Sequence, residues 1–249
     1  QLDPDTDANS FDAPGALIRA VGKPFSFEVL SVLPWKRREL VAKSYGAGRV
    51  FIAGDAAHQM SPTGGLGMNT GIGDAVDLGW KVAAMLQGWA GARLLESYEL
   101  ERKPVATTSV LASSEVFQYE TSLPTDPTIT DDSPDGERAR GRLAEALKGR
   151  RGAGNERLHE SVKLGYRYEG SPVICPEREM AIAKRETFQQ LCRSGARAPH
   201  AWISEGHSTL DLFGGGYVLL RFGKNSVEAD TIVDAAAARR VPLIVHDID

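Results

Sequence analysis

The sequence predicts an α/β (α+β) fold, and three observations lead to this class. A short apolar run, Arg49–Ala53, is followed by Gly54-Asp55 and a glycine-rich loop that opens into an apolar helical face. A long helical stretch extends from about Leu94 to Tyr119. Near the end of the chain, residues 217–245 read as strand, helix and strand. Strands that alternate with helices are typical of α/β architecture.

Composition limits the functional class. The 249 residues are 42% apolar and 25% charged, with a formal net charge of −4, which argues against nucleic acid or an anionic membrane as the main partner. No run of eighteen apolar residues occurs, so no membrane span is predicted, and the polar start is not a secretory leader. Cys175 and Cys192 lack CxxC partners, and the histidines lack metal-ligand spacing. We therefore expect free thiols, no metal site and a cytoplasmic protein.

The first third of the chain contains four predicted elements. Alternation of Phe25, Phe27 and Val29 with polar residues predicts a half-buried strand, and residues 36–45 predict a short helix. Residues 49–53 are typical of a strand that is covered on both faces. The next helix has one apolar face of about four turns and should stop at the glycines 88 and 91; its face is formed by Ile72, Ala75, Val76, Gly79, Val82, Ala83 and Leu86.

Later elements are separated by breaks rich in proline, aspartate or glycine. Pro104 should kink the helix over 94–119 or divide it into two. Residues 122–136 read as a loop or linker, and a small helix over 137–147 precedes a glycine-rich break and an extended stretch. The chain then predicts a βαβ unit formed by strand 217–222, helix 227–240 and strand 241–245.

The loop after the strand at 49–53 carries the strongest chemical signal. Asp55 could accept hydrogen bonds from vicinal hydroxyls, and Gly54 permits close backbone approach; the alternative is that Asp55 only forms a turn or caps a helix. The loop leaves backbone amides uncovered at a positive helix end, suited to an anion or an electron-rich ring; its marker residues are Pro62, Gly64, Gly65, Gly67 and Asn69. A P-loop is not expected, because GxxxxGK[ST] is absent and Lys81 lies well inside the helix.

This region resembles the second FAD-binding motif of the single-component flavoprotein aromatic hydroxylases, the relatives of para-hydroxybenzoate and phenol hydroxylase. The matching run is Gly54-Asp55-Ala56-Ala57-His58-x3-Pro62-x2-Gly65-x-Gly67-x-Asn69-x4-Asp74-x3-Leu78. A second run resembles the helix that follows in the family, Ser97-Tyr98-x2-Glu101-Arg102-x-Pro104. A third resembles the start of the thioredoxin-like domain of the phenol and polyketide hydroxylase branches, Arg197-x-Pro199-His200-Ala201-Trp202 with Ser208-x2-Asp211-Leu212.

The resemblance implies roles for individual residues. Asp55, beside Gly54, would contact the ribityl chain or pyrophosphate of FAD, and Pro62 would line the flavin-side wall of the active site. The backbone amides that would meet the pyrimidine edge of the flavin belong to Gly65, Leu66, Gly67, Met68 and Asn69. His58 and Asp74 also match, but we interpret them as structural: His58 would satisfy local backbone groups, and Asp74 would complement the helix dipole.

The resemblance also implies an organisation into four parts. Residues 1–45 would end a substrate-binding domain, 46–121 would form the C-terminal part of a Rossmann-like FAD-binding domain, 122–165 a linker with a small helix, and 166–249 a partial thioredoxin-like domain. The family's N-terminal GxGxxG and middle Asp-Gly motifs are absent. Gly71-x-Gly73 cannot replace the former, because it lies at the start of a helix. We therefore expect the later part of a longer protein that cannot bind FAD tightly alone.

The function implied is that of an FAD-dependent monooxygenase, present here as a fragment, that hydroxylates a phenolic or other small aromatic substrate with NAD(P)H and O2. Two alternatives remain open within the same scaffold: a Baeyer–Villiger oxidation and a polyketide-tailoring oxygenation. A third is a non-catalytic C-terminal fragment. A homodimer is also left open.

Overall fold

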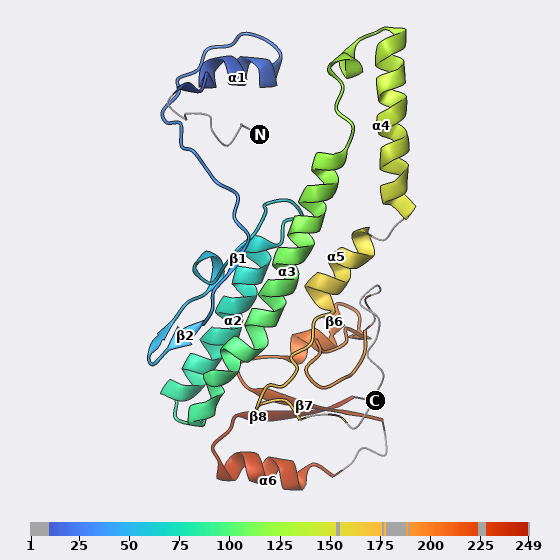
Figure 1. The fold of residues 1–249 in the computed structure, drawn as a ribbon. Coiled ribbons are helices and arrows are strands. Elements are labelled where there is room, and N and C mark those ends of the chain that lie inside the picture. Colours follow the sequence, from blue (N-terminus) through green and yellow to red (C-terminus); the bar gives the residue numbers. More distant parts are fainter. Residues whose placement is uncertain are drawn as a thin grey trace. The chain divides into compact units, whose positions relative to one another are not determined.

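The computed structural model describes residues 10–152, 155–175, 177, 188, 190–223 and 228–248, and the chain divides into two units at residues 38 and 39 (Figure 1). The first unit contains helix α1, Ala13–Val21. Asp12 caps α1, because its carboxylate accepts the amide of Gly15 at 2.9 Å, and α1 ends at Gly22 with φ of 81°.

The predicted strand at residues 25–29 is wrong. Phe25, Phe27 and Val29 lie in an irregular segment and remain more than a third exposed, with the two phenylalanine rings 4.7 Å apart. A strand is stabilised by pairing with a neighbour, and no described segment pairs with this one. Alternation alone therefore did not produce a strand.

The second unit begins with two small antiparallel pairs. β1 (Leu40–Val41) pairs with β4 (His58–Gln59), and β2 (Gly46–Ala47) pairs with β3 (Val50–Phe51). The predicted helix over 36–45 is wrong, because this backbone pairs with residues 57–59 instead; the Ala42 amide, for example, donates to the Ala57 carbonyl at 2.8 Å.

The predicted strand over 49–53 shortens to β3 and is not covered on both faces, since Val50 is 68% exposed. Its partner is antiparallel, so within the described residues Asp55 does not follow a parallel sheet. A small core lies behind these strands, where Tyr45, Ala57, Tyr98 and Ala106 are buried together. The Tyr98 hydroxyl donates to the Ile52 carbonyl at 2.9 Å and so ties the strand end to the helices.

Two long helices lie side by side in this unit (Figure 1). The first, α2 (Gly67–Leu86), confirms the predicted helix, and Gly88 follows it with φ of 76°. A 3-10 turn, Ala92–Leu94, leads into α3 (Glu96–Ser122). Pro104 does not divide α3, which continues through it.

The buried residues of α2 are mainly polar: Thr70, Asp74, Asp77, Lys81 and Ala84. The predicted apolar face is largely exposed instead, with Ile72 at 54%, Val76 at 66% and Leu86 at 84%. The buried face of α2 therefore consists mainly of polar and ion-pairing residues and differs from the predicted apolar face.

A 3-10 turn (Pro127–Thr130) separates α3 from α4 (Pro134–Gly152), and α5 (Asn155–Leu164) follows. The small predicted helix is confirmed but longer, because α4 continues through the first glycines of the expected break. α5 returns to α3, where Val162 packs with Leu66 and Ala112.

The C-terminal part contains two further strand pairs. β5 (Trp202–Ser204) and β6 (His207–Ser208) are antiparallel, and a 3-10 turn, Thr209–Leu212, follows them. β7 (Tyr217–Phe222) and β8 (Leu243–Ile248) are parallel, with α6 (Asp230–Ala238) between them. This confirms the βαβ unit, although β8 begins two residues later than predicted and the expected helix start at Val227 lies outside the described residues.

In the part of the chain that the structure describes, no helix has both the length and the apolar character required to cross a membrane.

Candidate functional site

The turn at Gly54–Ala56 begins with a glycine in the left-handed backbone conformation. Gly54 has φ of 59°, which a side chain would disfavour, and its amide donates to Asp74 Oδ2 at 3.1 Å. Asp55 follows it, is exposed, and has no hydrogen-bond partner among the described residues. The carboxylate of Asp55 makes no capping bond there, so the structure does not support the alternative role of a cap.

The glycine loop ends in a row of unpaired amides. Gly64 and Gly65 have φ of 87° and 63°, and the Gly65 amide donates to the Pro62 carbonyl at 3.2 Å. The first backbone bond of α2 runs from the Thr70 amide to the Leu66 carbonyl at 2.9 Å. Within the described residues, four amides of the predicted row therefore have no acceptor, those of Leu66, Gly67, Met68 and Asn69.

These groups are accessible from one end of α2. Pro62, Met68 and Asn69 are exposed, and Met68 reaches 75%. Leu66 differs, because the whole residue is only 2% exposed and packs with Ala112 and Val162, so its amide is less accessible than those of Met68 and Asn69. The Gly54 turn lies against the same helix, since a Cβ added to Gly71 would be 3.2 Å from Gly54 Cα. The structure thus brings the predicted cofactor residues together at one helix end.

The Asp74 carboxylate lies buried beneath this turn and bonds through both oxygens. His58 Nε2 is 2.7 Å from Oδ2, and Arg102 Nε donates to Oδ1 at 2.9 Å. An ionised carboxylate only accepts, so Nε2 carries a proton. Burial opposes ionisation of Asp74, but hydrogen bonds from His58, Arg102 and the Gly54 amide outweigh it and hold its pKa below the ordinary value.

The structural interpretation of His58 and Asp74 stands, but both assigned partners were wrong. His58 contacts the Asp74 carboxylate and not local backbone, and its Nδ1 has no hydrogen-bond partner among the described residues. Asp74 is the eighth residue of α2, beyond the first turn, where a dipole effect would act. Its carboxylate joins Arg102, His58 and Gly54 through hydrogen bonds.

A second buried ionic cluster lies further along α2. Lys81 Nζ is fully buried, donates to Asp77 Oδ2 at 2.6 Å, and also donates to Glu101. Ser171 donates its hydroxyl to the other Glu101 oxygen. Burial raises the pKa of Asp77 to about 6, because desolvation exceeds the attraction of Lys81, and Glu101 opposes a second negative charge.

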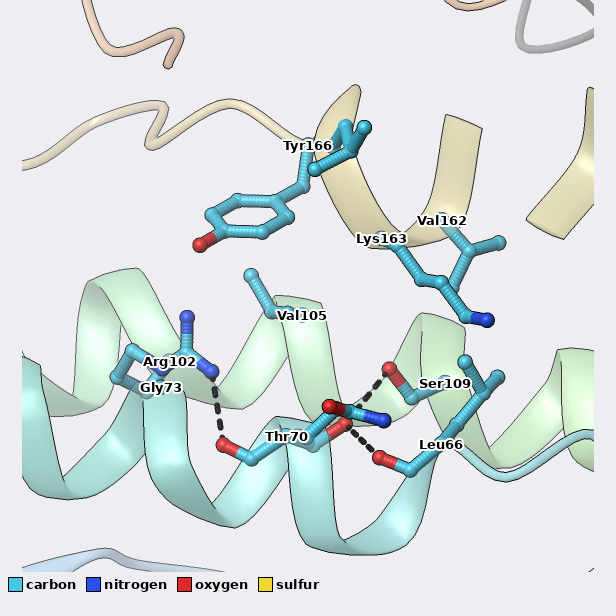
Figure 2. Close-up of a pocket in the computed structure, with 11 residues that line it drawn as sticks. Leu66, Thr70, Gly73, Arg102, Val105, Ser109, Val162, Lys163 and Tyr166 are labelled. Carbon is cyan, nitrogen blue, oxygen red and sulfur yellow. Dashed lines mark hydrogen bonds between the residues drawn. The ribbon is translucent and has the colours of Figure 1, made fainter. Parts of the chain in front are cut away.

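A cavity of about 370 Å³ lies between α2, α3 and the end of α5 (Figure 2). It borders the predicted cofactor-binding amides at Leu66 and Asn69. Its other lining residues are Thr70, Gly73, Arg102, Val105, Ser109, Val162, Lys163, Leu164 and Tyr166. Its polar groups are largely bonded to one another: the Thr70 hydroxyl bonds to the Leu66 carbonyl and to Ser109, and Arg102 donates to the Thr70 carbonyl.

Several of these side chains had only a weak sequence signal. The run from Ser97 to Pro104 marked Glu101 and Arg102 without indicating their partners. Nothing in the sequence indicated that Tyr168 would contact Arg102, as it does through a 3.1 Å bond from Nη1 to the tyrosine hydroxyl. Among the described residues, no three His, Cys, Asp or Glu side chains form a group able to hold a metal ion.

Comparison with known proteins assigns a family to the segment that carries these residues. Residues 16–113, which include the Gly54 turn, the amide row and Arg102, match the family described as FAD binding domain. This segment belongs to the FAD binding domain family. A protein of Streptomyces halstedii described as a polyketide hydroxylase is 41% identical over 207 residues, which cover 81% of this chain and 33% of that protein. The FAD-dependent monooxygenase apdD of Emericella nidulans is 33% identical, with 91% of this chain and 39% of that protein covered.

Solved structures extend the match beyond the FAD binding domain segment. The rebeccamycin biosynthetic enzyme RebC with reduced flavin is 43% identical with a TM-score of 0.82, covering 99% of this chain and 45% of that chain. Aklavinone-11 hydroxylase with FAD and aklavinone is 28% identical with a TM-score of 0.71, covering 99% and 43%. These matches confirm the resemblance to FAD-dependent aromatic hydroxylases. The chain spans less than half the length of each of these relatives.

Proposed function

We propose that the whole protein is an FAD-dependent monooxygenase and that this chain supplies the residues facing the flavin ring and the ribityl chain. FAD would provide the redox chemistry and the activation of O2. The residues of this chain would bind it, orient it and keep water away from the reacting atoms.

The observation that carries this proposal is the row of four unpaired amides beside an exposed carboxylate. The amides of Leu66, Gly67, Met68 and Asn69 lie at the positive end of α2, where they can stabilise negative charge on the pyrimidine edge of a flavin without a cation. Asp55 has free oxygens for ribityl hydroxyls, and Gly54 allows their close approach. The residues present therefore fit FAD.

Pro62 is proposed to form part of the active-site wall. It is exposed directly before the amide row, and its carbonyl already accepts the Gly65 amide. The Gly65 amide is therefore the one member of the predicted row that would have to exchange partners to contact the cofactor.

The proposed substrate is a phenol or an aromatic polyketide, with NAD(P)H as reductant. Names of relatives support the polyketide class: one is a polyketide hydroxylase, and another is the aklavinone 12-hydroxylase RdmE of Streptomyces purpurascens, 34% identical. A Baeyer–Villiger oxidation has no such support and stays the second candidate.

We propose the same division into four parts, residues 1–45, 46–121, 122–165 and 166–249. The parallel pair β7–β8 with α6 supports a partial thioredoxin-like domain over 166–249.

Free, exposed thiols at Cys175 and Cys192 support a cytoplasmic location. A homodimer is proposed as well, and the mass of the protein in solution tests it.

Substitution of Asp55 in the whole protein tests the cofactor assignment. Asp55→Ala should purify with markedly less flavin than the wild type, as measured by its visible absorption spectrum. Asp132→Ala, which removes another exposed aspartate, is the control and should retain the yellow colour. Full flavin retention in Asp55→Ala would refute the ribityl assignment, and a colourless, folded wild type would favour the non-catalytic alternative.

A further inference from the structure

Arg102 is a buried arginine whose three nitrogens all have assigned partners. It is 1% exposed, its Nε donates to Asp74 at 2.9 Å, and its Nη2 donates to the Thr70 carbonyl at 3.1 Å. Nη1 donates to the Tyr168 hydroxyl at 3.1 Å. The planar guanidinium thus joins α2, α3 and the segment after α5 at fixed angles, which a lysine cannot do.

Asp74 links Arg102 to the turn at Gly54–Ala56 through hydrogen bonds. One carboxylate oxygen accepts from Arg102, and the other accepts from the Gly54 amide and from His58. A rotation of the carboxylate would weaken contacts on both sides at once, because the group is planar and rigid. Asp55 follows Gly54 directly, so its placement depends on this carboxylate.

The packing around this linkage leaves little room for adjustment. A Cβ at Gly73 would lie 2.6 Å from Arg102 Nη2, and one at Gly71 would lie 3.2 Å from Gly54 Cα. Figure 2 shows Arg102 next to Gly73, with its dashed contact toward Thr70. A displacement of the guanidinium therefore has to move α2, the turn, or both.

Tyr168 is fixed independently of Arg102. Its amide donates to the Gly195 carbonyl at 2.9 Å, and three residues later Ser171 donates to Glu101, the neighbour of Arg102 on α3. Burial raises the pKa of Tyr168, so its hydroxyl stays neutral and accepts from the guanidinium. The segment 166–171 is thereby attached to two consecutive buried residues of α3.

We propose that Arg102 and Tyr168 are positioning residues for the turn at Gly54–Ala56, so that the segment 166–171 controls how tightly the flavin is held. This inference rests on the proposed function, because it assumes that Asp55 and the amides of α2 bind FAD. The linkage runs from the Tyr168 hydroxyl through Arg102 and Asp74 to the Gly54 amide.

Tyr168→Phe in the whole protein tests the linkage, since it removes only the hydroxyl that accepts from Arg102. Loss of this hydrogen bond should weaken FAD binding by about threefold, measured by flavin fluorescence titration. Hydrogen exchange of the Gly54 amide, measured without FAD, should accelerate, while exchange in β7 and β8 stays unchanged. The matched control is Tyr119→Phe. It removes another α3-contacting hydroxyl, which Tyr119 of α3 donates to the Ala146 carbonyl of α4, and it should change neither FAD binding nor Gly54 exchange.

Arg102→Lys is the second variant. It keeps the charge that Asp74 requires but loses the forked contacts, and we expect roughly tenfold weaker FAD binding and faster Gly54 exchange. Unchanged exchange at Gly54 in both variants would refute the proposal, as would a uniform increase across β7 and β8, which indicates a general loss of stability. If the wild type binds no FAD, the proposed function fails, whereas the Gly54 exchange still tests the linkage.

Discussion

At the scale of single residues, Asp74 joins three parts of the candidate site. Its carboxylate has no exposed surface and bonds the Arg102 guanidinium, the His58 ring and the Gly54 amide. A buried charge of this kind is costly to leave unpaired, so the energetic effect of Asp74 appears chiefly when one partner is removed.

We predict that Asp74→Asn lowers the free energy of unfolding by about 3 to 5 kcal/mol, because it leaves the buried Arg102 charge uncompensated. Urea denaturation followed by circular dichroism measures the change. Asp135→Asn breaks an exposed ion pair with Arg138 and should leave the unfolding midpoint almost unaltered. Equal effects of the two substitutions would contradict the structural importance of Asp74.

The contribution of Asp77 to the free energy of unfolding should depend on pH with the opposite sign to that of Asp74. Burial raises its pKa from 3.8 to about 6, so between these values the folded protein binds more protons than the unfolded one, and stability falls as pH rises. Asp74, whose pKa is lowered, contributes stability that is lost as pH falls below the ordinary range of a carboxyl group.

Asp77→Asn should therefore remove a decline in stability of about 2 to 3 kcal/mol between pH 4 and 6. The free energy of unfolding of the wild type and of the variant, measured at several pH values across this window, gives the difference directly. If the stability of Asp77→Asn declines between pH 4 and 6 as much as that of the wild type, the decline belongs to another group.

At the scale of elements, α2 differs from a simple amphipathic helix. Its periodicity predicted the helix correctly, yet the residues that face α3 are those that form ion pairs, Asp74 with Arg102 and Lys81 with Glu101. Glycines on α2 allow this close contact, and Gly73 is the position where the guanidinium of Arg102 approaches most closely.

Two glycines of α2 should therefore respond oppositely to alanine. At Gly79 a Cβ would meet nothing within 4 Å, so Gly79→Ala should stabilise the protein by about 0.5 to 1 kcal/mol through helix propensity. Gly73→Ala has the same propensity gain but meets Arg102, and we expect a net loss of about 1 to 2 kcal/mol. Thermal or urea unfolding compares the two, and a stabilised Gly73→Ala would contradict the close contact.

At the scale of the whole molecule, an apolar face of α2 remains uncovered in the described structure. Ile72 and Val76 are 54% and 66% exposed and lie one turn apart on the same side. Contiguous apolar surface promotes association, whereas scattered apolar side chains do not.

The double substitution Ile72→Gln with Val76→Gln should reduce self-association of this chain, measured by light scattering at matched concentrations. The free energy of unfolding should change by less than about 0.5 kcal/mol, because both positions are on the surface. The control Leu111→Gln removes an exposed apolar side chain on α3 and should reduce scattering less. No reduction in the double variant would show that this face does not drive association.

Sequence reasoning predicted the elements whose signals are local. The apolar period predicted α2, the continuous helical stretch predicted α3, and the βαβ pattern near the C-terminus predicted the parallel pair β7–β8. It failed for the strand at 25–29 and the helix at 36–45, because strand pairing depends on a distant partner: β1 pairs with residues 58–59. Sheet partners are not encoded in a short window.

The sequence by itself identified the family of residues 16–113, because the fixed spacing of residues between Gly54 and Leu78 is a local pattern that closely resembles one cofactor-binding motif. The tertiary structure alone decided what supports that motif. Asp74 meets Arg102 across 28 positions, and Arg102 meets Tyr168 across 66. Charged side chains are ordinarily solvated, so their burial against partners so far apart in the chain follows from folding and cannot be deduced from residue type or spacing.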